Sequence, residues 1–266
     1  MTNFGFSLMS ELHDPRALVD QARRAEAAGF DFVTISDHFH PWLYSHGHSP
    51  YAWSVLGAVS EATERLRIMT LVTAPIIRYH PAIVAQKAAT MGALSGGRFE
   101  LGLGAGENLN EHVVGAGWPP AKTRHEMLAE AIEVIRALWG GEYVTHHGEH
   151  YDVEDAKLYT LPDEPVPLHV AVSGEKSIAL ALEHADGMVA VDPDSELTAR
   201  FHGKARIGQL AMSVHDDEDE ALRLAHERFR FAAQGWKVMA ELPNPVNFDA
   251  ATETVRPCLS TVDLTS

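Results

Sequence analysis

The sequence predicts a parallel α/β barrel. Strand-like and helix-like runs alternate along the 266 residues, and such alternation is typical of a parallel sheet. Seven βα units favour a barrel over a doubly wound sheet. Two strand-like runs are followed directly by polar segments, S-D-H-F-H-P-W at 36–42 and G-L-G-A-G-E-N-L-N-E at 102–111. In a parallel barrel, the C-terminal ends of the strands form the rim that carries the chemistry.

The first half of the chain contains four predicted strands with clear helix signals between them. Asp14 and Pro15 are expected to begin the first helix, because aspartate caps a helix and proline suits its first turn. Gly29 is expected to end that helix. The predicted strands are residues 4–9, 31–35, 66–72 and 98–103, and the further helices are 50–65, 81–94 and 123–139.

The second half continues the pattern less regularly. Residues 140–153 are expected to form a hairpin outside the repeat, and residues 234–249 to be irregular or short helices. The remaining predicted strands are 167–172, 186–191 and 206–214, and the helices are 175–184 and 216–231.

A barrel needs eight βα units, and no further strand is evident after Phe231. The eighth unit is therefore expected to be missing, either because the chain is C-terminally truncated or because a neighbouring chain closes the barrel. The alternative is a short eighth strand at residues 258–264.

Composition excludes several classes of protein. The chain is 45% hydrophobic and 22% charged, which is ordinary for a globular domain. A net charge of -16 disfavours nucleic acid and anionic membranes as partners. One cysteine, Cys258, excludes an intramolecular disulfide and a cysteine-based zinc site. Neither an apolar membrane span nor a signal peptide is evident, so a cytoplasmic location is expected.

The segment 36–42 brings together Asp37, His38, His40 and Trp42. A single histidine here would fit an ordinary capped or solvated loop. The whole group after a buried strand indicates a site, because histidine transfers protons near neutral pH and tryptophan offers a flat wall with an N–H donor.

Two histidine pairs, His38 with His40 and His46 with His48, have the spacing of residues on one side of an extended segment. They allow a metal site. However, no carboxylate or cysteine pattern of a known metal site accompanies them, so no metal is predicted.

The glycines of 102–106 allow two interpretations. They could form a tight turn with positive φ angles, or let a flat ring lie close to the backbone with the Glu107 carboxylate pointing at it. Ser173 and Gly174 end a strand immediately before a helix, where backbone N–H groups suit a phosphate.

Several segments together resemble a known superfamily. The matching pieces are S-D-H-F-x-P-W at 36–42, R-Y-x-P-A at 78–82, A-T-M-G at 89–92, G-x-G-x-G-E-x-L-N-E at 102–111 and the strand ending at Gly174. They are similar to the bacterial luciferase-like superfamily. The similarity is to its branch that uses coenzyme F420, a 5-deazaflavin, and to the pattern of F420-dependent glucose-6-phosphate dehydrogenase and its relatives. The resemblance runs from residue 4 to about residue 231.

The resemblance implies a (β/α)8 TIM barrel of the luciferase-like type, here with the eighth unit missing. It implies one domain over 1–266, with a hairpin insertion at about 140–165 and an irregular tail at about 232–266. It also implies a non-proline cis peptide between Leu71 and Val72. The implied cofactor-binding residues are Asp37, Leu71, Val72, Thr73, Glu107, Asn110, Ser173 and Gly174, and the implied catalytic residues are His38, Trp42 and Glu107.

The implied reaction is hydride transfer between a small organic substrate and the deazaflavin. His38 would take the proton of a substrate alcohol, Trp42 would shield the intermediate, and Glu107 would deliver a proton to the ring. The loop 192–194, Asp-Pro-Asp, stands where sugar-phosphate members carry a lysine. A neutral alcohol, ketone or activated alkene is therefore expected rather than glucose 6-phosphate.

Three alternatives remain open. One is an FMN-dependent luciferase-like monooxygenase. Another is a non-catalytic F420 binder or an inactive truncated paralogue. The third is a metal-dependent hydrolase built on the histidine pairs. The relatives also suggest a homodimer.

Overall fold

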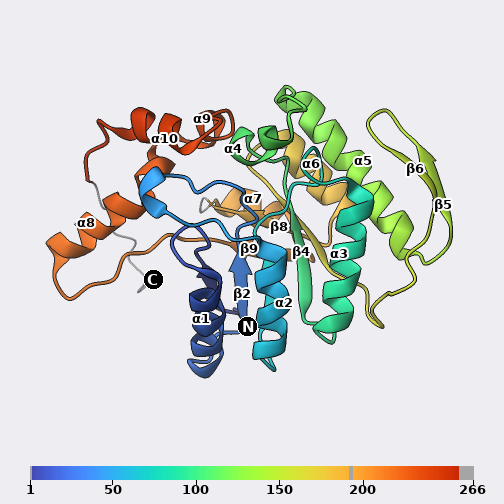
Figure 1. Cartoon of the computed structure of the whole chain (residues 1–266), viewed down its shortest axis with the longest axis horizontal. Coiled ribbons are helices and arrows are strands. Elements are labelled where there is room, and N and C mark those ends of the chain that lie inside the picture. Colours follow the sequence, from blue (N-terminus) through green and yellow to red (C-terminus); the bar gives the residue numbers. More distant parts are fainter. Residues whose placement is uncertain (1, 192–193, 258–266) are drawn as a thin grey trace.

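A computed structural model describes residues 2–191 and 194–257 of the chain. Seven parallel strands form one sheet in the order β1-β2-β3-β4-β7-β8-β9, which confirms the predicted α/β barrel as an incomplete one (Figure 1). The strands are β1 (Gly5–Leu8), β2 (Phe32–Ile35), β3 (Arg67–Thr70), β4 (Phe99–Leu103), β7 (Leu168–Ala171), β8 (Gly187–Ala190) and β9 (Ala205–Gly208).

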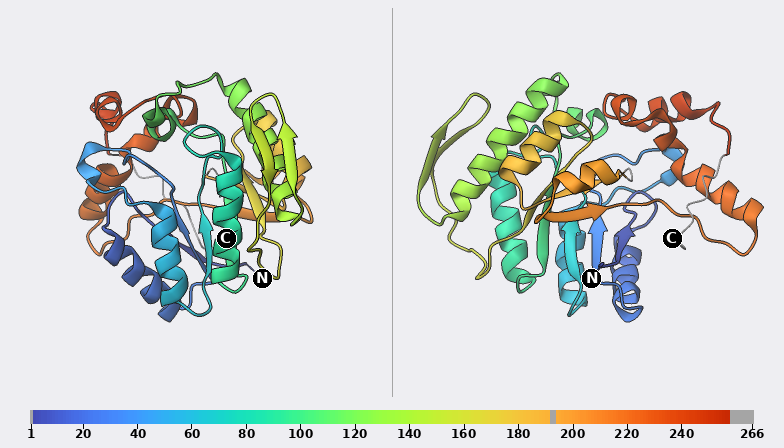
Figure 2. Two further views of the ribbon diagram at one scale, coloured as in Figure 1. Left: turned by 45° about the vertical axis from the view of Figure 1, so that its right-hand side comes forward. Right: turned by 180° about the vertical axis from the view of Figure 1, so that it is seen from behind.

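Helices cover the outside of the sheet (Figures 1 and 2). The larger ones are α1 (Pro15–Ala27), α2 (Ala52–Ala62), α3 (Pro81–Leu94), α5 (Ala121–Trp139), α6 (Glu175–His184) and α8 (Glu218–Phe229). The short ones are η1 (Tyr44–His46), α4 (Asn108–Glu111), η2 (His112–Val114), α7 (Ser195–Arg200), η3 (Arg230–Gln234), α9 (Trp236–Met239) and α10 (Pro245–Thr252). Among the described helices, none is both long and apolar enough to cross a membrane.

The barrel has an opening between its first and last strands. Within the described residues, no ladder joins β9 to β1. The side chain of Gln209 reaches across and donates to Ser7 Oγ at 3.2 Å. The alternative eighth strand at 258–264 lies outside the described residues.

Local signals place the helix ends where the sequence predicts them. The Asp14 carboxylate accepts from the N–H groups of Arg16 at 2.9 Å and Ala17 at 3.1 Å, as expected of an N-cap. Gly29 follows the helix with a φ of +88°, a conformation that glycine adopts without a steric penalty. The predicted bounds of the helices at 81–94 and 175–184 are confirmed.

The seventh strand is shorter than predicted. The sequence predicts residues 206–214, whereas β9 ends at Gly208. The partner strand β8 ends at Ala190, and among the described residues the ladder between the two strands stops at Ala190 and Gly208. Met212 and Val214 are exposed as a result.

Two elements at opposite sides of the sheet lie outside the βα repeat (Figure 2). The predicted hairpin is present as β5 (Val144–His147) and β6 (Asp152–Ala156), and it contacts α5. On the other side, the C-terminal helices pack over the rim. A second apolar cluster, separate from the main core, consists of Trp42, Leu43, Leu109, Phe231, Met239 and Phe248.

The β4 backbone lies very close to the end of β3. A Cβ atom added at Gly102 would lie 2.1 Å from the Thr70 carbonyl oxygen, and one at Gly104 would lie 2.6 Å from Val72 Cγ2. Thr70 and Val72 therefore occupy the volume that a side chain at Gly102 or Gly104 would need. These two glycines are thus required by the close approach of neighbouring strands, whether or not a flat ring lies against the segment.

Replacing Gly102 by Ala is expected to lower the free energy of unfolding by about 3 kcal/mol, because the new Cβ meets rigid backbone. Gly57→Ala is the matched control. A Cβ there meets nothing within 4 Å, and in the middle of α2 it should stabilise the chain by about 0.5–1 kcal/mol. Urea unfolding measures both, and equal effects of the two substitutions would contradict the packing argument.

Candidate active site

Segments from neighbouring strands meet at one rim. Strands β1, β2, β3, β4 and β7 are consecutive in the sheet and parallel, so their C-terminal ends point the same way. The segments that follow them contain every residue that the sequence predicts for the site. The rim is therefore the candidate active site.

The Asp37 carboxylate is the centre of a buried hydrogen-bond cluster. Its Oδ2 accepts from Trp53 Nε1 and Thr73 Oγ1, each at 2.8 Å. Its Oδ1 accepts from the Tyr79 hydroxyl at 3.1 Å and the Arg78 guanidinium at 3.2 Å. Asp37 is 2% exposed, and four donors fill the capacity of a carboxylate. It joins α2, the end of β3 and the segment before α3.

Arg78 joins this cluster to a second buried carboxylate. Its Nε lies 3.4 Å from Glu111 Oε1, and its backbone N–H donates to Glu111 Oε2 at 2.8 Å. Burial raises the pKa of Glu111 to about 7, although the charge of Arg78 acts in the opposite direction. Sequence analysis included both residues in motifs but gave neither a role in the site.

His38 forms a buried ion pair with Glu11. The two atoms His38 Nδ1 and Glu11 Oε1 are 2.8 Å apart, and Ser36 Oγ donates to the same carboxylate oxygen at 2.7 Å. Burial opposes the ionisation of Glu11, but His38 and Ser36 outweigh it and lower its pKa to about 2. Burial would lower the pKa of His38, yet the Glu11 carboxylate raises it.

Sequence analysis missed Glu11. The available signal was its position just past the first predicted strand, which is a rim position of a parallel barrel.

Trp42 stands between His38 and the C-terminal helices. Its ring meets the His38 ring edge-to-face at 4.8 Å and stacks on Phe231 at 4.9 Å. Phe248 meets it edge-to-face at 5.2 Å. The predicted neighbours His38 and Trp42 are thus in contact, and the second apolar cluster holds Trp42 in place.

Glu107 and Asn110 lie together after β4. Asn110 Nδ2 donates to Glu107 Oε2 at 3.2 Å, and its Oδ1 accepts from the N–H groups of Phe39 at 2.8 Å and His40 at 3.2 Å. Asn110 therefore ties the segment after β2 to the segment after β4. Glu107 is 8% exposed.

The end of β3 supplies an apolar part of the rim. The Leu71–Val72 peptide bond is cis, as the resemblance implies. Leu71 and Val72 are partly exposed, as is Ala105 after β4. Thr73, in contrast, is buried and donates a hydrogen bond to Asp37. Partly exposed apolar side chains here lie beside the buried polar cluster.

Ser173 and Gly174 lie at the N-terminus of α6 and are exposed. Their backbone N–H groups donate to Ser177 Oγ at 3.0 and 3.2 Å. The N–H groups of Glu175 and Lys176 in the first turn have no partner within the helix. These are the groups best able to meet an anion.

The histidine pairs do not converge. His38 faces Glu11, while His40 Nδ1 lies 2.9 Å from the carbonyl oxygen of Leu109. Among the described residues, no group of three potential ligands could hold a metal ion.

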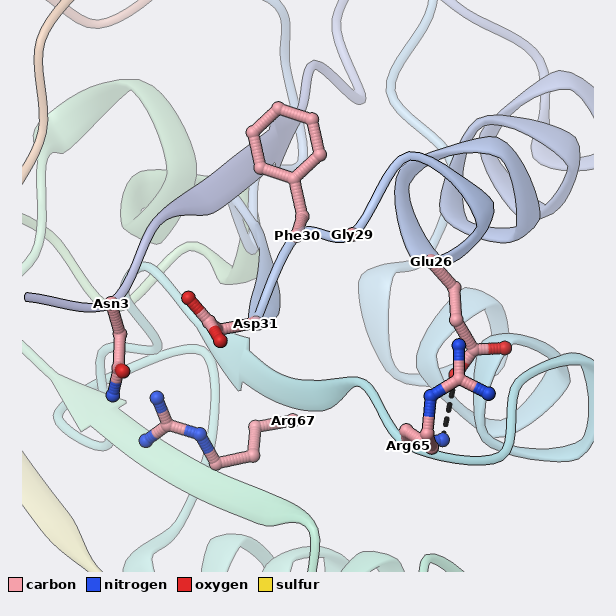
Figure 3. Close-up of a pocket in the computed structure, with 7 residues that line it drawn as sticks. All are labelled: Asn3, Glu26, Gly29, Phe30, Asp31, Arg65 and Arg67. Atoms are coloured by element: carbon pink, nitrogen blue, oxygen red, sulfur yellow. Dashed lines mark hydrogen bonds between the residues drawn. The ribbon is translucent and has the colours of Figure 1, made fainter.

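A hollow of about 420 Å³ lies at the opposite, N-terminal end of the strands (Figure 3). Three of its charged side chains are engaged with the protein. Glu26 accepts from the Arg65 backbone N–H, Asp31 accepts from the Phe4 N–H at 2.8 Å, and Arg67 pairs with Glu100 at 2.7 Å. It contains none of the predicted site residues.

The rim is suited to proton transfer. The buried Glu11 carboxylate lies 2.8 Å from one nitrogen of His38, Nδ1, as an ion pair, and no described side chain is paired with the second nitrogen, Nε2. An imidazole with one nitrogen fixed in this way can exchange a proton with a bound molecule through the other.

Comparisons with known proteins find a family and several relatives of this chain. The profile of the family described as luciferase-like monooxygenase matches residues 2–253. The chain is 46% identical over 255 residues to the F420-dependent glucose-6-phosphate dehydrogenase of Beutenbergia cavernae, covering 90% of this chain and 74% of that protein. It is 40% identical over 247 residues to the enzyme of the same name from Microbacterium testaceum, covering 86% and 72%.

Among solved structures, the chain is similar to an F420-dependent secondary alcohol dehydrogenase in complex with an F420-acetone adduct. The TM-score is 0.88 at 33% identity, over 96% of this chain and 82% of that one.

Replacing Asp37 by Asn is expected to lower the free energy of unfolding by about 3 kcal/mol, because it leaves buried donors and the Arg78 charge without their acceptor. Asp20→Asn is the control, since its pair with Arg24 is exposed and should contribute less than about 0.5 kcal/mol. Urea unfolding measures both. A loss no larger than that of the control would show that the Asp37 cluster does not stabilise the rim.

Proposed function

The chain belongs to the luciferase-like monooxygenase family, and from that premise we propose that it is an oxidoreductase that uses coenzyme F420 to interconvert a small alcohol and its ketone. The observation that carries the proposal is the buried Glu11–His38 pair at the rim, with His38 Nε2 left for a substrate. The names of the relatives at 46% and 40% identity, and of the solved structure at 33%, support the cofactor and the alcohol donor.

The residues at the rim fit a deazaflavin with a phosphate-bearing tail. Leu71, Val72 and Ala105 offer partly exposed apolar surface beside the polar cluster, which suits a flat ring. The first turn of α6 offers N–H groups to a phosphate. When bound, F420 supplies a carbon, C5, that accepts or gives a hydride.

Individual roles follow from this fit. Leu71 and Val72 would back the ring, with Glu107 and Asn110 close to it. Thr73 is fully buried and donates to Asp37, so it would order this segment behind the ring. The segment at Ser173 and Gly174 would hold the phosphate end. All four acceptor positions of Asp37 are taken by the protein, so it would contribute by ordering the segments around the cofactor.

His38 is the proposed proton donor and acceptor for the substrate oxygen. Burial alone would lower the pKa of His38, but the Glu11 carboxylate raises it above its usual value and so favours the protonated imidazole. In that state it can donate a proton to a ketone oxygen. Alcohol oxidation needs the neutral imidazole, so this direction is favoured at higher pH.

Trp42 and Glu107 are assigned supporting catalytic roles. Trp42 contacts the His38 ring and, with Phe231 behind it, would exclude water from one side of the reacting centre. Glu107 is buried and held by Asn110. Its carboxylate would exchange a proton with the cofactor ring.

A neutral alcohol fits the rim better than a sugar phosphate. The carboxylates of Glu11, Asp37, Glu107 and Glu111 gather here, and Arg78 is already paired with two of them. A phosphate dianion would be repelled by such a cluster. Glucose 6-phosphate is the second candidate because the relatives at 46% and 40% identity are named for it.

Titration with oxidised F420, beside a parallel titration with FMN, tests the cofactor. We expect saturable binding of F420, followed by fluorescence, and no saturable binding of FMN at the same concentrations. Turnover is then followed with 2-propanol and with glucose 6-phosphate as alternative donors. Saturable binding of FMN alone would instead favour a flavin-dependent monooxygenase.

A second test uses the pH profile of kcat/KM. Wild-type alcohol oxidation should rise with pH up to the raised pKa of His38, and ketone reduction should fall above it. In Glu11→Gln the negative charge is lost and burial dominates, so both limbs should move to lower pH. His38→Gln should lose the limbs and lower kcat about 10²–10⁴-fold. Limbs that stay in place in Glu11→Gln would remove His38 as the titrating group.

A further inference from the structure

The ammonium group of Lys87 lies in an aromatic cage, which we define as the rings of Tyr51, Trp53 and Tyr79. Lys87 is on α3, and its Nζ is buried without a hydrogen-bond partner among the described residues. Nζ lies 3.4 Å from the ring centre of Tyr79, 4.4 Å from that of Trp53 and 5.1 Å from that of Tyr51. Buried polar groups are normally hydrogen-bonded, so here the ring faces hold the charge.

The aromatic cage is directly connected to the centre of the rim. Trp53 Nε1 and the Tyr79 hydroxyl donate to the Asp37 carboxylate at 2.8 and 3.1 Å. These two rings thus present a face to Lys87 and a polar atom to Asp37. Because each ring is rigid, a cation that fixes its face also fixes the direction of its donor.

The charges of Lys87 and Asp37 support each other without touching. Burial lowers the pKa of Lys87 to about 8, and the Arg78 charge acts in the same direction, while the Asp37 carboxylate acts to keep Lys87 protonated. The Arg78 guanidinium also lies 4.5 Å from the ring centre of Tyr79. Tyr79 is therefore held by two cations at its ring and by Asp37 at its hydroxyl.

We propose that Lys87 is a positioning residue of the rim. It holds Trp53 and Tyr79 by their ring faces so that both donate to Asp37, and through Asp37 it sets the affinity of the rim for coenzyme F420. The part that concerns F420 rests on the proposed function. The part that concerns Asp37 rests on the contacts alone.

The competing explanation is that Lys87 only fills space between α3 and α2. Its aliphatic stem could pack in this way whatever its charge. Two variants separate the explanations. Lys87→Met keeps the length and packing but removes the charge, and Lys87→Arg keeps a charge that can lie over an aromatic face.

The first measurement needs no cofactor. The chain has five tryptophans, so indole ¹⁵N labelling gives a small set of N–H resonances, and Trp53→Phe assigns that of Trp53. Lys87→Met should shift this resonance and speed its hydrogen exchange, because the bond to Asp37 weakens. Lys87→Arg should restore much of the wild-type position. Lys122→Met, which removes an exposed lysine, is the control and should change nothing.

The second measurement is the Kd for F420. Lys87→Met should raise it about 10-fold, with Lys87→Arg closer to wild type. The turnover number at saturating F420 should change far less, because Lys87 does not touch the Glu11–His38 pair. A purely space-filling role would leave the Kd of Lys87→Met unchanged.

The outcomes separate this inference from the proposed function. An unchanged Trp53 resonance in Lys87→Met overturns the positioning role. A shifted resonance with an unchanged Kd overturns the link to cofactor affinity. A wild-type chain that binds no F420 overturns the proposed cofactor, and the Trp53 resonance then decides the positioning role by itself.

Discussion

The rim depends on one buried carboxylate. Asp37 is charged and almost inaccessible to water, so it must be surrounded by donors to exist in the folded state. Those donors come from α2, from the end of β3 and from the segment before α3. The positions of these three segments are fixed together, because displacing any one leaves a buried charge short of a partner.

A second buried pair makes the rim chemically asymmetric. The Asp37 cluster uses all of its acceptors internally. In the Glu11–His38 pair, Glu11 instead engages one side of the imidazole, and the other side is the one proposed to meet a substrate. Trp42 connects the reactive part to the C-terminal helices, because the ring that contacts His38 also stacks on Phe231. The rim thus combines a hydrogen-bonded centre at Asp37 with the proposed proton-transfer group, His38, beside it.

Much of the fold could be predicted from the sequence because its signals are local. Asp14, Pro15 and Gly29 bound α1 through contacts with their own neighbours in the chain, and periodicity within one run is enough to predict a helix or a strand. The predicted end of the seventh strand was wrong, because the length of a strand depends on the strand it pairs with. Contacts between distant segments could not be predicted for the same reason. Glu11 meets His38 only because two rim segments come together in the barrel.

The candidate site residues follow strands that are neighbours in the sheet, so their arrangement can be compared with the position of the opening in the barrel. The rim residues follow β1, β2, β3, β4 and β7, which are consecutive in strand order, while the opening lies between β9 and β1. Glu11 is nearest to that opening. It is nonetheless fixed from the β2 side, where Ser36 and His38 hold its carboxylate and the His48 N–H donates to its carbonyl oxygen at 3.1 Å. The geometry of the Glu11–His38 pair therefore depends on the β1–β2 junction rather than on closure between β9 and β1.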